Sequence, residues 1–286
     1  MAISLNSNVT SLEVSRNLGK VTDKLNSTVS RLSSGLRITK PSDDPAGNQI
    51  ADKLAADAKI AATAIQNANN ALSFTSIADS ALSNVSGLLT RMAELAEQSA
   101  NGIFANSQRS ALSNEFEALG SEIQRIAVTT TFNDLNLLSG GAAVNLQIGL
   151  DGTANSRITL AAVNGTLESI NLAGTGSNAL QYSIIGGTSD DSVSASRLAL
   201  DAVKGAIDSL NATRGSLGST GSRLNAAIEN LQGQRAEFIA AESRVRDADI
   251  AQEVAELVRL QVLQQANTAV LAQANQQPGI TLALLG

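Results

Sequence analysis

The sequence has no cysteine, no histidine and no tryptophan among its 286 residues, and only 2% of the residues are aromatic. Sites that depend on thiolates or imidazoles, such as zinc fingers, thiol redox centres and Cys or His nucleophiles, are therefore excluded. The scarcity of aromatic side chains argues against a large aromatic-lined ligand pocket. The net charge of −6 argues against a general nucleic-acid binder, which must neutralise phosphates.

Proline is also scarce, since it occupies only positions 41, 45 and 278. Residues 46–277 therefore contain no residue that must interrupt a helix. No stretch is apolar enough to cross a bilayer, because glutamine and asparagine recur in the uncharged segment after Arg259. The segment before Arg16 lacks both basic residues and a continuous apolar run, so no signal peptide is predicted. We expect no membrane partner, no nucleic-acid partner, no cofactor and no metal.

The two ends of the chain carry opposite charge and similar helical patterns. Residues 1–40 have a net charge of +4, and residues 247–286 have a net charge of −3. Apolar residues recur at helical spacing in both segments, which predicts an antiparallel pair of terminal helices. The pattern alone leaves open whether this pair closes an ordinary bundle or serves assembly. The residues of the predicted inner seam are Val14, Leu18, Val21, Leu25, Leu32, Ile250, Val254 and Leu257.

The next helix is predicted to begin at Asp44 and Pro45. An aspartate side chain can cap free backbone N–H groups, and proline suits the first helical position. Small and apolar residues then keep heptad spacing from Leu54 to Leu72 and, after a phase shift, continue to Met92. A further helix is predicted around residues 112–126.

The middle of the chain changes character. Apolar residues alternate with polar ones from Val144 to Leu150, and Asp151 and Gly152 favour a turn, so a β-hairpin is predicted near residues 142–160. Residues 161–191 are rich in Gly, Ser, Thr and Asn, and we expect them to form a short, solvated surface insertion.

A second long helix with the strongest periodicity of the chain follows the insertion. Its predicted shell seam repeats every seven residues, at Val203, Leu210, Leu217, Leu224, Leu231, Phe238 and Val245. The predicted fold class is therefore mainly α: a long coiled-coil-like helical bundle with paired N- and C-terminal helices and a small β-hairpin region. Adjacent carboxylates at Asp43-Asp44 and Asp190-Asp191 lack plausible companions for catalysis, so we predict no enzyme activity and no catalytic residue.

Several segments carry a specific resemblance to a known family. Residues 32–38 (LSSGLRI) and 43–47 (DDPAG) resemble the N-terminal signature of bacterial flagellins. Residues 94–102 resemble the end of the first core helix of that family, and residues 243–249 and 263–276 resemble its C-terminal half. The chain thus resembles a short flagellin without the large outer domains.

This resemblance implies a secreted structural subunit that self-assembles, as a helical homopolymer, into the extracellular flagellar filament used for swimming motility. Residues 1–43 and 247–286 would form the inner domain at the filament core. Residues 44–160 and 192–246 would form the helical shell, and residues 161–191 a variable surface insertion. The resemblance also implies export by the flagellar type III pathway and contacts with an export chaperone, the export gate, and the flagellar cap and hook–filament junction proteins.

An animal receptor is a further implied partner. Relatives are bound as monomers by the innate immune receptor Toll-like receptor 5, and the matching positions are Arg91, Leu95 and Glu115. A spacing of four places Arg91 and Leu95 near one helix face. The competing interpretation is that Leu95 packs inward and Arg91 contacts a neighbouring subunit.

Two other functions compete with the filament subunit. A hook-associated junction or cap component would share the helical ends but would stop growing after a few copies. A coiled-coil adaptor would form a stable soluble dimer. Growth from short filament seeds separates the first alternative from a polymer, and sedimentation at increasing concentration separates the second.

We predict that the terminal segments are disordered in the free monomer and helical in the polymer, because isolated helices are marginal without packing. Limited proteolysis should therefore trim roughly residues 1–40 and 250–286 from the monomer and spare them in filaments. Equal protection of these segments in both states would contradict the prediction.

Overall fold

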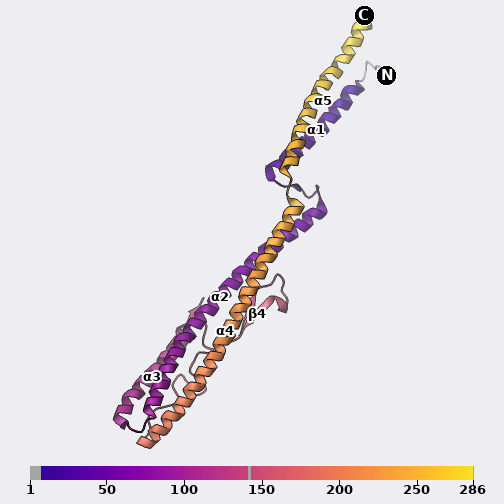
Figure 1. The fold of residues 1–286 in the computed structure, drawn as a ribbon. Coiled ribbons are helices and arrows are strands. Elements are labelled where there is room, and N and C mark those ends of the chain that lie inside the picture. Colours follow the sequence, from indigo (N-terminus) through magenta and orange to yellow (C-terminus); the bar gives the residue numbers. More distant parts are fainter. Residues whose placement is uncertain (1–7, 141–142, 286) are drawn as a thin grey trace. The chain divides into compact units, whose positions relative to one another are not determined.

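The computed structural model describes residues 8–140 and 143–285, so residues 1–7 and 286 of the expected inner domain and residue 142 of the expected hairpin lie outside the described residues. The chain forms two compact units, residues 1–58 with 236–286 and residues 59–235. Figure 1 shows its helices, and the mainly helical fold class is confirmed. The helices are α1 (Val9–Ser34), α2 (Pro45–Ser99), α3 (Asn106–Thr129), α4 (Ser189–Arg246) and α5 (Ile250–Leu285).

The core of the unit formed by residues 59–235 lies between α2, α3 and α4. Val203, Leu210, Leu217 and Leu224 of the predicted shell seam are at most 2% exposed, and Leu231 is 6% exposed. The last two residues of that seam, Phe238 and Val245, belong to the other unit, where they are partly exposed.

Helix α2 keeps one heptad phase through this core, so the predicted phase shift is wrong. From Ala64 onward, one series of its buried positions alternates between spacings of four and three, with Ala81 and Leu95 buried beside it, and small residues occupy the first half of the series. The prediction followed the larger side chains of Ile65 and Leu72, which are only partly buried beside the seam. The buried series is Ala64, Ala68, Ala71, Thr75, Ala78, Leu82, Val85, Leu89, Met92, Ala96 and Ser99.

The predicted β-hairpin is confirmed. Strands β3 (Val144–Gln147) and β4 (Arg157–Leu160) pair antiparallel, and a 3₁₀ turn, η1 (Ala154–Ser156), precedes β4. Ile148, directly after β3, is 5% exposed against the alanines of α2 and Leu224 of α4. The hairpin therefore covers the apolar residues of α2 and α4 in this part of the unit.

A second, shorter hairpin follows α3. Strands β1 (Thr131–Phe132) and β2 (Leu135–Asn136) pair antiparallel. The two residues between them, Asn133 and Asp134, have φ angles of 50° and 62°. Positive φ at both central positions is the requirement of the tightest hairpin turn, and Asn and Asp tolerate it better than most residues.

Residues 161–191 do not form the expected solvated insertion. Leu167, Ile170, Leu172 and Ile184 are at most 1% exposed and belong to the same hydrophobic cluster as α2, α3 and α4. A buried hydrogen-bond network holds the end of this segment, because the hydroxyls of Ser99 and Ser196 each donate to the Ile184 carbonyl at 2.9 Å. Sparse leucines and isoleucines without a regular period thus complete the core of the unit.

We predict that Leu172→Ala lowers the free energy of unfolding of the monomer by about 2–5 kcal/mol, because it leaves a cavity in a fully buried site. The matched control is Leu198→Ala, since Leu198 is 65% exposed on α4 and its truncation should change stability by less than about 0.5 kcal/mol. Denaturant unfolding followed by circular dichroism measures both. Equal, small effects would contradict the burial of residues 161–191.

Candidate self-assembly surface

Helices α1 and α5 lie side by side and run in opposite directions (Figure 1). Their facing residues keep heptad spacing on both helices. The facing residues of α1 are Ser11, Val14, Leu18, Val21, Leu25, Thr28 and Leu32. The facing residues of α5 are Glu253, Leu257, Leu260, Gln264, Asn267, Leu271 and Ala274. The α1 part of the predicted seam therefore lies on the face that meets α5.

The α5 part of the predicted seam needs correction. Leu257 lies on the face toward α1, but Ile250 and Val254 are 48% and 42% exposed. The true face passes through Leu260, which is 1% exposed. The prediction followed the first apolar spacing in the segment, whereas α5 has apolar residues on more than one side, and its facing positions include Glu253 and two amides.

Polar side chains join the two helices at intervals. Near the start of α1, Asn8 Nδ2 donates to the Ala274 carbonyl at 2.7 Å, and Ser11 Oγ donates to Asn275 Oδ1 at 2.7 Å. Further along, Gln264 Nε2 donates to the hydroxyl of Thr22 at 3.4 Å. Some side-chain amides of α5 therefore have hydrogen-bond partners on α1. In a helix surrounded by lipid, such amides would have no partner.

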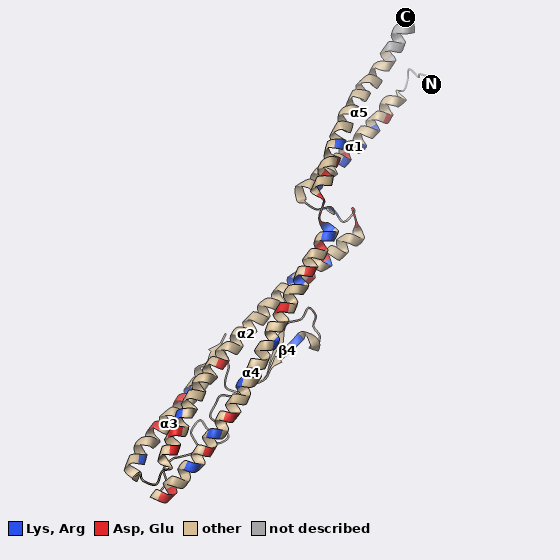
Figure 2. Cartoon of the chain, viewed as in Figure 1, with Lys and Arg blue, Asp and Glu red and all other residues tan. Residues whose placement is uncertain are grey.

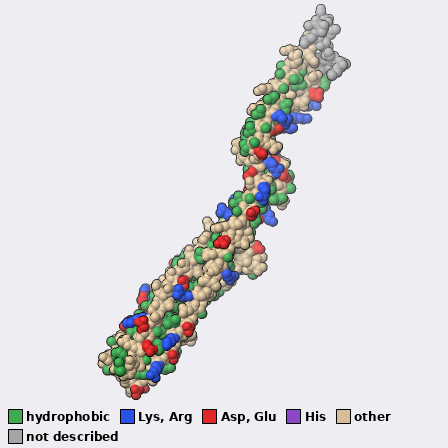
Figure 3. All heavy atoms as spheres, in the orientation of Figure 1, with side chains coloured by type: hydrophobic (Ala, Val, Ile, Leu, Met, Phe, Trp, Pro, Cys, Tyr) green, Lys and Arg blue, Asp and Glu red, His purple; other side chains and the backbone are tan. Residues whose placement is uncertain are grey.

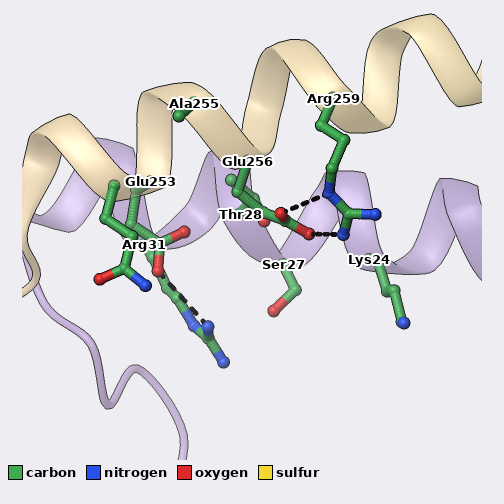
Figure 4. A pocket seen from close by; sticks show the side chains of 9 residues that line it. Lys24, Ser27, Thr28, Arg31, Glu253, Ala255, Glu256 and Arg259 are labelled. Atoms are coloured by element: carbon green, nitrogen blue, oxygen red, sulfur yellow. Dashed lines mark hydrogen bonds and ion pairs between the residues drawn. The ribbon is translucent and has the colours of Figure 1, made fainter.

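A groove of about 550 Å³ lies between the two helices near the start of α5 (Figure 4). Across it, Arg31 Nη1 lies 3.5 Å from Glu253 Oε1. On its other side, Arg259 donates to the Glu256 carboxylate, and these hydrogen bonds hold the pKa of Glu256 below its usual value. Among the described residues, Arg31–Glu253 is the one ion pair that joins α1 to α5. The opposite net charges of the two ends thus produce little direct pairing.

The segment between α1 and α2 forms hydrogen bonds with the segment where α4 ends and α5 begins. Gly35 ends α1 with a φ of 72°, and its carbonyl accepts from the Ala248 amide at 2.9 Å. The amide of Arg37 donates to the Arg246 carbonyl at 2.7 Å, and its Nη2 donates to the Val245 carbonyl at 2.7 Å. The last carbonyls of α4 are therefore satisfied by the segment that leaves α1.

The start of α2 is capped by the predicted residue. Asp44 Oδ1 accepts a hydrogen bond from the Gly47 amide at 2.9 Å, with Pro45 at the first helical position. The neighbouring Asp43 accepts from the backbone amides of Lys40 and Thr39, which lower the pKa of its carboxyl group. A Cβ atom on residue 47 would displace the Asp44 carboxylate from its capping position, and glycine leaves room for it.

The outer side of the pair is apolar and lacks a partner within the described part of the chain. Figure 3 shows apolar side chains on the surface of this region, and Figure 2 shows that α5 carries no charge along its far half. On α1, Val9 is 65% and Leu12 is 56% exposed. The exposed large apolar residues of α5 are Ile250, Val254, Val258, Val262, Leu263 and Val270.

The three candidate receptor residues do not share one surface. Arg91 lies on the surface, where its Nε donates to Glu115 at 2.8 Å and its Nη1 donates to Glu94 at 3.1 Å. The hydrogen bonds that Arg91 donates to the Glu94 and Glu115 carboxylates raise the pKa of Arg91. Leu95 is 0% exposed, because α3 packs against that side of α2 and widens its buried arc. Of the two interpretations left open by the sequence, the inward packing of Leu95 therefore holds, and the exposed apolar anchor is wrong.

No cluster of three or more carboxylates that could hold a metal ion is found in residues 8–140 and 143–285. Within the same described ranges, no helix is long and apolar enough to cross a membrane.

Comparison of the sequence with known protein families identifies helical regions at both ends of the chain. The model of the bacterial flagellin N-terminal helical region matches residues 5–143, and that of the C-terminal helical region matches residues 200–285. Flagellin of Halalkalibacterium halodurans is 36% identical over 282 residues, which cover 98% of this chain and 99% of that protein. The flagellar filament 30.7 kDa core protein of Treponema maltophilum is 31% identical over 289 residues, with 98% and 99% coverage.

A solved structure shares the fold. A protein of Vibrio parahaemolyticus assigned as flagellar hook-associated superposes with a TM-score of 0.60 on 72% of this chain and on all of its own length, at 14% identity. That similarity concerns the fold alone. Both family models and the whole-length relatives describe structural proteins and not enzymes. The chain therefore belongs to the bacterial flagellin family and is a structural subunit of the extracellular flagellar filament.

Proposed function

We propose that copies of this chain polymerise by packing the outer faces of their α1–α5 pairs against one another at the filament core. The observation that carries this proposal is the row of exposed apolar residues on α5. Ile250, Val254, Val258, Val262 and Val270 recur at intervals of four or eight residues, and each is between 42% and 59% exposed. Burying one such side chain contributes about 1.5–3 kcal/mol, so a surface of this kind favours assembly.

The absence of charged side chains along most of α5 also supports assembly through this outer face. No ionisable residue follows Arg259, so neighbouring copies would desolvate no charged side chain along most of α5. Its glutamine and asparagine side chains can exchange water for partners on other copies at little cost. The seam residues of α1 would stay inside the pair, while Ile250 and Val254 would contact neighbouring subunits.

In this arrangement, residues 1–43 and 247–286 form the inner domain of the filament. Residues 44–160 and 192–246 form the helical shell around it, with the seam from Val203 to Val245 inside each subunit. Residues 161–191 complete the shell core on one side and present their exposed part outward. We propose no catalytic site and no cofactor for the chain.

Membership of the flagellin family also supports proposals about the export pathway of the chain and its protein partners. We propose that the chain leaves the cell through the flagellar type III pathway, with an export chaperone and the export gate as partners. The cap and hook–filament junction proteins would contact it at the ends of the filament.

Growth from seeds tests the polymer against a junction or cap component. Purified monomer added to short fragments of its own filaments should elongate them without limit, and electron microscopy measures their length against time. Growth that stops after a few copies would favour the junction component. A soluble dimer that never elongates seeds would favour the coiled-coil adaptor.

We predict that Val262→Asp abolishes elongation of seeds, because it places a charge in the proposed interface, whose burial costs several kcal/mol. The matched control is Val128→Asp, since Val128 is 52% exposed on α3, outside the α1–α5 pair. The control should elongate seeds at close to the normal rate. Normal elongation by the Val262 variant would place the interface elsewhere.

We also propose that the monomer is recognised by Toll-like receptor 5 through the paired side chains of Arg91 and Glu115, without Leu95. These side chains are 49% and 44% exposed, and they offer a cation and a carboxylate on the α2–α3 surface. Intact filament should give no response, because neighbouring subunits would cover Arg91 and Glu115, which lie about 20 Å along α3 from Val128.

We predict that Arg91→Ala and Glu115→Ala each weaken receptor activation by the monomer about fivefold or more, the effect of losing an interface contact of roughly 1 kcal/mol. The control is Arg125→Ala, because Arg125 makes a similar exposed pair with Glu122 on α3. A reporter-cell assay on monomer measures all three variants. Equal responses from the variants and the control would reject the contact.

A further inference from the structure

The apolar seam between α1 and α5 does not by itself define how the two helices are aligned. The helices come from opposite ends of the chain, so no turn between them fixes their register. On α1, Val14 and Val21 are one heptad apart, as are Leu18 and Leu25. Sliding α1 by seven residues would again place apolar side chains in the seam. Such a slip would move α1 by about 10 Å along α5, since a helix rises 1.5 Å per residue.

Arg31 and Glu253 break this repetition. Glu253 occupies the first facing position of α5, and its side chain is only 14% exposed, against 32% for Arg31. Arg31 Nε and Glu253 Oε2 are both buried without a partner among the described residues. A half-satisfied ion pair contributes little net stability, but this pair forms in one register only, and a slip breaks it. Polar residues at seam positions are known to select register in coiled coils at the expense of stability.

A backbone contact lies close to the ion pair. The Gly35 carbonyl accepts from the Ala248 amide, four residues after Arg31 on one side and five before Glu253 on the other. We call Arg31, Glu253, Gly35 and Ala248 together the alignment clamp. Either one-heptad slip breaks every contact of this clamp, whereas the apolar residues of α1 stay at seam positions.

We infer that the alignment clamp selects the register in which the α1–α5 pair enters the filament, with Arg31 and Glu253 as its positioning residues. This inference rests on the proposed assembly through the outer faces of the pair. In one slipped state, Glu253 would face Lys24, which lies one heptad before Arg31 and lines the same groove. In the other, Glu253 would lie beyond the end of α1 at Ser34. In both, the exposed apolar residues of α1 and α5 would be displaced relative to each other and would no longer fit the faces of neighbouring copies.

The absence of cysteine makes the register directly measurable. Ser11→Cys with Asn275→Cys reports the observed register, because the two side chains are hydrogen-bonded at 2.7 Å. Ser11→Cys with Thr268→Cys reports the slip that brings Lys24 to Glu253, since position 268 is one heptad earlier on α5. Both pairs are oxidised in filaments, and intramolecular cross-links are counted by electrophoresis and peptide mass spectrometry. In the otherwise unchanged chain we expect the first pair to form the dominant cross-link.

Charge reversal tests the ion pair. Arg31→Glu should change the ratio of observed to slipped cross-links by about tenfold in favour of the slip, the scale of a contact pair's coupling energy. Adding Glu253→Arg to it should restore the original ratio. Arg16→Glu is the matched control, because Arg16 is an exposed residue of α1 away from the groove, and it should leave the ratio unchanged. Variants that polymerise poorly alone are copolymerised as a minor component with unmodified chain.

The outcomes separate the clamp from the proposed function. If Arg31→Glu leaves the cross-link ratio as the control does, or if the double reversal fails to restore it, the register role of the pair is wrong. If the ratios behave as expected but Val262→Asp elongates seeds normally, the clamp stands and the proposed interface fails. If Arg31→Glu is excluded even from mixed filaments, the double reversal with Glu253→Arg should restore entry, and its continued exclusion would overturn the inference.

Discussion

The meeting of the two chain ends is the constraint on which the rest of the molecule depends. The seam between α1 and α5 contains hydroxyls, amides and a carboxylate at positions that an ordinary two-helix pair would fill with leucine. Of its described residues, only Thr28, Leu260 and Ala274 are buried in the single chain. In the other unit, Val203, Leu210 and Leu224 are each fully buried. Because isolated helices are marginal without packing, a pair with so little core would gain stability from the neighbouring copies of the proposed filament.

Large side chains at constant spacing made the helical part of the fold predictable. The seven-residue repeat of α4 located its buried face, and alternation with a following turn located β3 and β4. The same reasoning failed on α5, where apolar residues occur on several sides, so that Ile250 and Val254 are exposed while Gln264 faces α1. A helix that is to be surrounded on all sides has no single apolar stripe, and its first contact face cannot be read from hydrophobicity alone.

The segment between β4 and α4 escaped prediction for a different reason. Leu167, Ile170, Leu172 and Ile184 follow no helical or strand period, and glycine, serine and threonine dominate between them. Their burial depends on the surface offered by α2, α3 and α4, which is a property of tertiary structure. The burial of Leu95, which the sequence left open, depends on tertiary structure in the same way, because Leu95 belongs to the cluster shared by α2, α3 and α4.

At the chain ends, the position of one ion pair matters more than the opposite net charges of the two segments. The ends differ in sign, yet Arg259 pairs with Glu256 on its own helix and leaves Arg31–Glu253 as the described link across the pair. One partly buried ion pair adds little binding energy, so apolar contacts must supply the affinity of the pair for its neighbours. Apolar contacts are non-directional and tolerate sliding, however, whereas the Arg31–Glu253 contact forms in one register only. Affinity and alignment are therefore carried by different residues on the same two helices.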